Sequence, residues 1–123
     1  MSVSCGGANV GFLDVDLAIR QTGGAQAMQG MLPILEESLA RDIPRISELL
    51  VQGDVEGAGR VLHSLKGFIP IFCGAALSGL VAHVHELSKT GSVQDVAAAY
   101  APLCADLNGL LADVVNYRRD HAA

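Results

Sequence analysis

The sequence predicts an all-α protein, an up-and-down antiparallel four-helix bundle with a short additional helix at its N-terminus. Apolar residues make up 50% of the 123 residues, and in the longer segments their spacing alternates between three and four. No stretch of useful length alternates between apolar and polar residues as a half-buried strand would. Short glycine-containing turns separate the helical segments, and short turns force neighbouring helices to run antiparallel.

The first two helices are marked by caps and by one apolar stripe. Asp14 can cap a short first helix, which Gly23 and Gly24 would end. A second helix is expected from Gln26 to Val51, with a single buried stripe. Two residues inside this helix are expected to bend it or split it: Pro33 and Pro44.

The remaining three helices follow the same logic. Asp54 can cap a third helix over residues 55–72, and a fourth is expected over residues 76–89. Ser92 and Asp95 resemble a capping box before the last helix, which Pro102 would kink. The expected core positions of the fourth helix are Leu77, Leu80, Val84 and Leu87.

The chain is the size of one ordinary domain. We expect a flexible leader over residues 1–11, the helical bundle over residues 12–117 and a polar tail over residues 118–123. Neither an internal repeat nor a second domain is indicated.

Charge and cysteine content exclude several classes of function. The net charge is −5 and no Lys/Arg cluster occurs, so neither nucleic acid nor direct membrane contact is expected. The three cysteines are odd in number, widely spaced and without metal-ligand spacing, which is typical of free thiols in a reducing compartment. No signal peptide and no membrane-spanning stretch is recognisable, so we expect a cytoplasmic protein with no bound cofactor or metal.

The stretch HSLKGFIP, residues 63–70, places a histidine beside residues that a helix interior usually avoids. At roughly 100° per residue, His63, Lys66, Gly67 and Pro70 share one face of the third helix, opposite its apolar stripe. A glycine on this outward face leaves the backbone bare beside the imidazole, and the lysine adds a positive charge one turn away. These properties suit a histidine that receives a phosphoryl group from a partner protein.

The string HSLKG at residues 63–67 resembles the H-x-L-K-G signature of histidine-containing phosphotransfer (HPt) domains. The similarity extends to DVDLAIRQTGG at residues 14–24, to VQGDVEGAGRVLHSLKG ending at residue 67, and to GAALSGLVAHVHEL at residues 74–87. It covers residues 12–115, nearly the whole chain. Small residues usually follow the glycine in this family, whereas here Phe68, Ile69 and Pro70 do, and Cys73 stands where a glycine is usual.

The resemblance implies roles for five residues. His63 would be the phosphoacceptor, Lys66 would help to hold the phosphoryl group, and Gly67 would clear space for a docking receiver domain. His85 stands where the family often has Gln or Glu contacting the ring or its phosphate, and Lys89 stands where a basic residue often assists. Lys89 also has a plain structural interpretation, as a cation at a helix C-terminus.

The resemblance also implies partners: response-regulator receiver domains and a hybrid sensor histidine kinase, with Mg²⁺ carried by the receiver. The protein itself would be a monomer without autonomous kinase or phosphatase activity, either free-standing or part of a larger sensor kinase. The alternative is a helical docking module that binds receivers or kinase domains without carrying phosphate. His83 is expected to be an ordinary surface residue, and His121 to be inert in the tail. A metal site is not expected, because His83 and His85 are two residues apart, diverge on a helix and cannot chelate one metal together.

Overall fold

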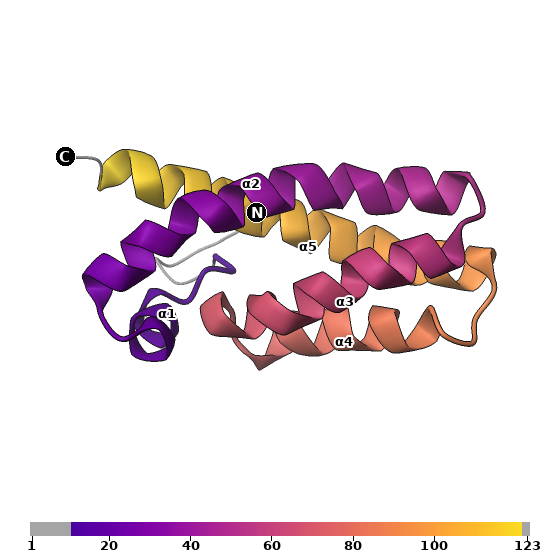
Figure 1. Ribbon diagram of the computed structural model, residues 1–123, viewed down its shortest axis with the longest axis horizontal. Coiled ribbons are helices and arrows are strands. Elements are labelled where there is room, and N and C mark those ends of the chain that lie inside the picture. Colours follow the sequence, from indigo (N-terminus) through magenta and orange to yellow (C-terminus); the bar gives the residue numbers. More distant parts are fainter. Residues whose placement is uncertain (1–10, 122–123) are drawn as a thin grey trace.

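The computed structural model describes residues 11–121, so most of the expected leader lies outside the described residues. Within that range it contains helices and no strand, in the order α1 (Val15–Thr22), α2 (Ala25–Val51), α3 (Val55–Phe72), α4 (Ala75–Leu87) and α5 (Val93–Asp120). The four longer helices run along the long axis of the molecule, and α1 lies at the end where α2 begins and α3 ends (Figure 1). The predicted four-helix bundle with a short N-terminal helix is confirmed.

Local signals in the sequence set most helix ends. The carboxylate of Asp14 accepts a hydrogen bond from the Leu17 amide at 3.0 Å, and that of Asp54 accepts one from the Gly57 amide at 2.8 Å. Ser92 and its partner three residues on form the expected capping box before α5. Gly23 ends α1 with a φ of 98°, a left-handed conformation in which a side chain would be strained.

The prolines do not split their helices. The helix α2 contains Pro33 and Pro44 and is continuous from Ala25 to Val51, although its N-terminal part slopes relative to the rest in Figure 1. Each proline removes one intrahelical hydrogen bond. Buried side chains on both sides of each proline pack into the core, and this tertiary packing keeps the two halves in one helix.

Some helix boundaries and core positions differ from the sequence prediction. The helix α4 ends at Leu87, so Lys89 lies in the turn that follows, and α5 continues through Asp120 into the expected tail. In α4 the buried positions include Val81 and His85, whereas Leu80 and Leu87 are only partly buried. Position 85 therefore belongs to the buried side of α4.

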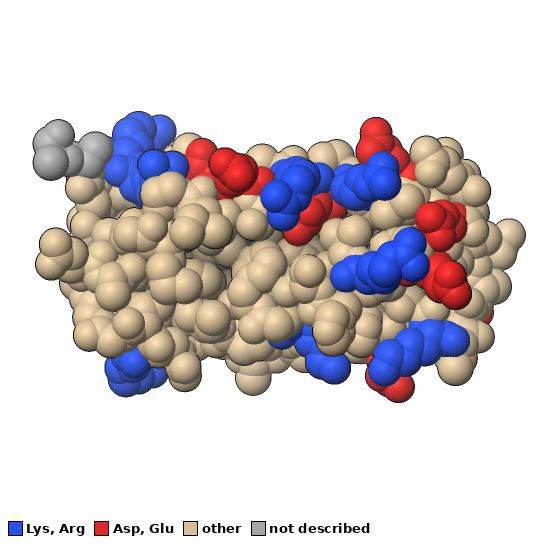
Figure 2. Space-filling view, in the orientation of Figure 1, with Lys and Arg blue, Asp and Glu red and all other residues tan. Residues whose placement is uncertain are grey.

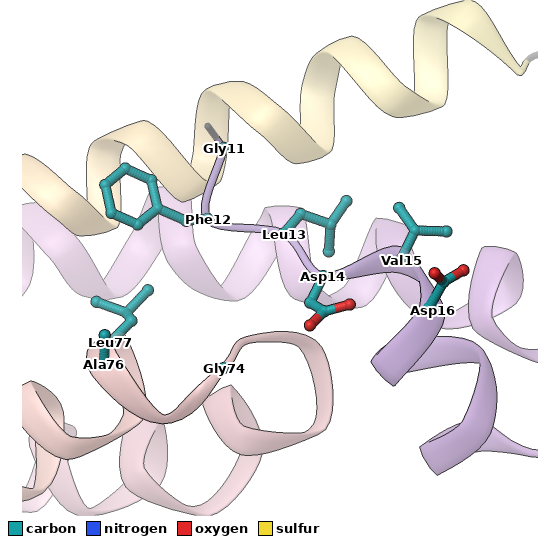
Figure 3. Close-up of a pocket in the computed structure, with 9 residues that line it drawn as sticks. All are labelled: Gly11, Phe12, Leu13, Asp14, Val15, Asp16, Gly74, Ala76 and Leu77. Carbon is teal, nitrogen blue, oxygen red and sulfur yellow. The ribbon is translucent and has the colours of Figure 1, made fainter. Parts of the chain in front are cut away.

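The segment before α1 is tied to both neighbouring helices. The Asp113 carboxylate on α5 accepts hydrogen bonds from the backbone amides of Phe12 and Leu13. The amide of Asp14 donates to the Phe72 carbonyl at the end of α3. A cavity of about 640 Å³ lies beside this segment, between it and the start of α4 (Figure 3). It contains no histidine or lysine, and Asp14, one of its two carboxylates, already caps α1.

Candidate functional site

The outward face of α3 is arranged as its periodicity predicts. His63, Lys66, Gly67 and Pro70 are exposed, whereas the stripe positions of the same helix are buried. A Cβ atom placed on Gly67 would meet no atom within 4 Å, so the helix surface beside His63 is open. Another protein can therefore approach the imidazole closely at this point.

Charge is unevenly distributed over this side of the molecule. Figure 2 shows both basic and acidic side chains toward the end where α3 begins, while in the half nearer α1 the charged side chains lie along the edges of the view. Among residues 11–121, neither Lys66 nor Arg60 takes part in an ion pair, so both cations are available to a ligand. Lys66 lies three residues after His63 and Arg60 three residues before it, which places both on the histidine's side of the helix.

An open groove of about 740 Å³ runs between α3 and α4 beside His63. On the α3 side it is lined by Glu56, Gly59, Arg60 and His63. On the α4 side and the following turn it is lined by His85, Ser88 and Lys89. The structure thus brings together three of the predicted site residues in one groove, while Lys66 and Gly67 lie beyond its edge on the same face of α3.

The imidazole rings of His63 and His85 meet in this groove, with centroids 5.3 Å apart and planes tilted by 45°. His85 is only 7% exposed, and its Nδ1 atom is buried without a hydrogen-bond partner. Burial lowers the pKa of His85, and the positive charges of Lys66 and Lys89 and the His63 ring lower it further. Only Glu86 acts in the opposite direction. His85 is therefore a neutral imidazole beside an exposed one.

Gly59 and Ser88 determine how closely α3 and the end of α4 approach, and neither was singled out in the sequence. The Ser88 hydroxyl donates a hydrogen bond to the His85 carbonyl at 2.6 Å. A Cβ atom on Gly59 would lie 2.8 Å from that hydroxyl oxygen, too close for an undisturbed contact. One signal was available: Gly59 and Gly67 stand four residues before and after His63, so both flank it along one ridge of the helix.

The Lys89 ammonium lies 3.2 Å from the Glu86 carboxylate, and both side chains are largely exposed. Such a pair is weak in water, so the ammonium can exchange this partner for a ligand in the groove. Lys89 lines the groove from the turn after α4, although it is not part of that helix.

The other histidines lie apart from this groove. His83 is exposed on α4, and His121 stacks on Tyr117 with ring centroids 3.9 Å apart. No group of three or more His, Cys, Asp or Glu side chains within residues 11–121 could hold a metal ion. In the same part of the chain, no helix is long and apolar enough to cross a membrane.

Comparison with known proteins identifies the fold. No protein-family model matches the chain, and no curated protein matches it. Among solved structures it matches the crystal structure of the HPt domain from the Hpt sensor hybrid histidine kinase of Shewanella, with a TM-score of 0.80 and 23% sequence identity. The match covers 90% of this chain and 97% of that domain. The chain therefore has the helical-bundle fold of an HPt domain.

Proposed function

We propose that this protein is a phosphorelay intermediate, which accepts a phosphoryl group on His63 and passes it to an aspartate of a receiver domain. The observation that carries the proposal is the exposed His63 on α3, with an open glycine surface on one side and an unpaired lysine within a turn. The fold supports it, because the matched solved structure is the HPt domain of a sensor hybrid histidine kinase.

The transfer step requires little from the protein besides position and charge. The lone pair of the neutral His63 ring attacks the phosphorus of a receiver aspartyl phosphate. The bond between phosphorus and the aspartate oxygen breaks, and the aspartate leaves as a carboxylate. The neutral form of the ring carries a free lone pair on one nitrogen, so the attack requires no separate base. Delivery to a second receiver is the same step in reverse.

The surrounding residues have separate roles in this proposal. Lys66 and Lys89 offset the negative charge of the phosphoryl group, as cations do in other phosphoryl-transfer sites. Gly67 leaves room for the receiver surface that carries the aspartate. His85 contacts the group held on His63, since the two rings share the groove. The Mg²⁺ ion that supports the reaction belongs to the receiver.

The proposal includes the partners expected from the sequence, namely receiver domains and a hybrid sensor histidine kinase. It also includes a monomeric, cytoplasmic protein whose bundle spans residues 12–117 and which has no kinase or phosphatase activity of its own.

The test is phosphotransfer from receivers of the same genome. Purified receiver domains are phosphorylated with radiolabelled acetyl phosphate and Mg²⁺ and then incubated with the protein. We expect the protein to acquire a label that is lost in acid and stable in base, as a phosphohistidine is. The variant His63→Gln should acquire none, and the matched control His83→Gln, which changes an exposed histidine outside the groove, should label normally.

Two results would contradict the proposal. Acid-stable label would indicate a hydroxyl ester, and undiminished label in folded His63→Gln would place the acceptor elsewhere. If receivers bind the wild-type protein but no receiver transfers its phosphate, the docking-module alternative is the better description.

A further inference from the structure

His85 is a polar ring in a position that the helical pattern reserves for an apolar side chain. It is buried on α4 beside Val81 and Val84, and a leucine or valine there would complete the apolar surface. A buried polar atom without a partner is destabilising, so the ring has to be accounted for by something other than packing. One of its nitrogens lacks a partner in the interior, and the same ring lines the groove beside His63.

The burial of Nδ1 determines where the ring holds its proton. A neutral imidazole carries hydrogen on one nitrogen and a lone pair on the other. A hydrogen on Nδ1 would be an N–H donor in the interior with no acceptor in reach, an arrangement that folded proteins rarely contain. With the hydrogen on Nε2, the interior holds only a lone pair. Nε2 is not among the buried unpartnered atoms, so its hydrogen is directed to the groove, where water or a ligand can accept it.

The charges around the ring keep it in this neutral form. Lys66 from α3 and Lys89 after α4 oppose protonation, and burial opposes it more strongly than either. Glu86 favours protonation, but its carboxylate is paired with Lys89. Glu56 and Arg60 also border the groove from α3 and carry opposite charges.

We propose that His85 is a hydrogen-bond donor of fixed tautomer, whose Nε2–H binds an oxygen of the phosphoryl group on His63. This inference rests on the proposed function and specifies the chemistry of its second histidine. A neutral donor suits both directions of transfer, because it stabilises the dianionic phosphoryl group on His63 without adding a positive charge that would trap the product. No proton needs to leave His85 during the step.

The tautomer can be read in the wild-type protein without any partner. Nitrogen NMR of the protein labelled in its imidazole rings separates protonated from unprotonated ring nitrogens. At pH 7 we expect His85 to show a protonated Nε2 and an unprotonated Nδ1, before and after His63 is phosphorylated with phosphoramidate. A protonated Nδ1 in either state, or a doubly protonated ring at pH 7, would overturn the inference.

The neutral form of His85 can also be tested through the pH dependence of protein stability. Because burial lowers the pKa of His85, the unfolded chain binds a proton near the ordinary value of 6.5 that the folded protein does not bind. The free energy of unfolding therefore falls as the pH drops through 6.5, and the variant His85→Gln should lack this part of the decline. Parallel pH profiles for the two proteins would contradict a buried neutral His85.

Two substitutions test the donor itself. A glutamine places its amide nitrogen where Nε2 of histidine lies, whereas an asparagine reaches only the position of Nδ1. We expect His85→Gln to accept phosphate from a charged receiver within about threefold of wild type, and His85→Asn to be slower by at least about tenfold. Equal rates in two variants that fold normally would overturn the inference.

Failure of the two proposals can be distinguished. If neither receivers nor phosphoramidate phosphorylate His63, the proposed function is wrong, and the inferred phosphoryl contact is wrong with it. If transfer to His63 is normal but His85→Asn behaves as wild type, only the donor role of His85 is refuted.

Discussion

Replacing Gly67 with alanine should stabilise the protein. The residue lies inside α3, and its added Cβ would meet no atom within 4 Å, so the substitution has no steric penalty. Alanine is favoured over glycine in a helix by about 0.5–1 kcal/mol. In a domain of this size, 1 kcal/mol raises the melting temperature by roughly 4 °C. Urea unfolding and thermal melting would measure both quantities.

The matched control is Gly30→Ala. Gly30 is exposed within α2, also has no neighbour within 4 Å of its added Cβ, and does not border the groove. Both alanine variants should therefore gain similar stability. A loss of stability in Gly67→Ala alone would show that the face beside His63 is not open.

The larger substitution Gly67→Gln tests why the face is open. If a receiver surface docks there, a long side chain has to be displaced or accommodated, at about 1–3 kcal/mol, which corresponds to roughly tenfold or more in transfer rate. The control Gly30→Gln should transfer at the wild-type rate. A wild-type rate in Gly67→Gln would refute the docking argument, even if His63 remained the acceptor.

Three further predictions concern the contact between α3 and the end of α4, a buried hydrogen bond between α5 and α2, and the two cysteine thiols of the bundle. Gly59→Ala should leave the free energy of unfolding nearly unchanged, because displacing the Ser88 hydroxyl offsets the helix-propensity gain of about 1 kcal/mol. In a Ser88→Ala background, where that hydroxyl is absent, Gly59→Ala should raise the free energy of unfolding by about 1 kcal/mol. Tyr100→Phe should lose about 1 kcal/mol in urea unfolding, because the buried hydroxyl donates to an α2 carbonyl at 2.9 Å. Burial raises the pKa of the Cys73 thiol to about 12, so at pH 8 iodoacetamide should alkylate the partly exposed Cys104 and spare Cys73, as mass spectrometry of the folded protein would show.

Each of these has a clear contrary result. Additive effects of the Gly59 and Ser88 substitutions would mean that the two residues do not touch. If Tyr100→Phe is as stable as wild type, the Tyr100 hydrogen bond does not contribute to holding α5 against α2. Equal alkylation of the two thiols would show that Cys73 is not buried.

The helical spacing predicted the outward face of α3 around His63 from local information alone. Residues three and four apart share a face of any helix, so the exposure of His63, Lys66 and Gly67 follows from their spacing against one apolar stripe. Helix caps are equally local, and Asp14 and Asp54 bond to amides three residues away.

The burial of His85 and the environment of its ring depend on how α4 packs against the neighbouring helices. Its spacing did not place it among the expected core positions of α4, but in the folded protein it is buried and its Nδ1 atom lacks a partner. The continuity of α2 through Pro44 likewise depends on packing, because the lost intrahelical bond is compensated by contacts distant in sequence.

Sequence alone therefore determined the number of helices, most of their ends and the direction in which His63 points, because periodicity and capping act within a few residues. Only the tertiary structure decided that the ring centroids of His85 and His63 lie 5.3 Å apart. It also decided that Ser88 packs against Gly59, where a larger side chain would clash. The distance between two helices depends on side chains from both, and no spacing along one segment contains that information.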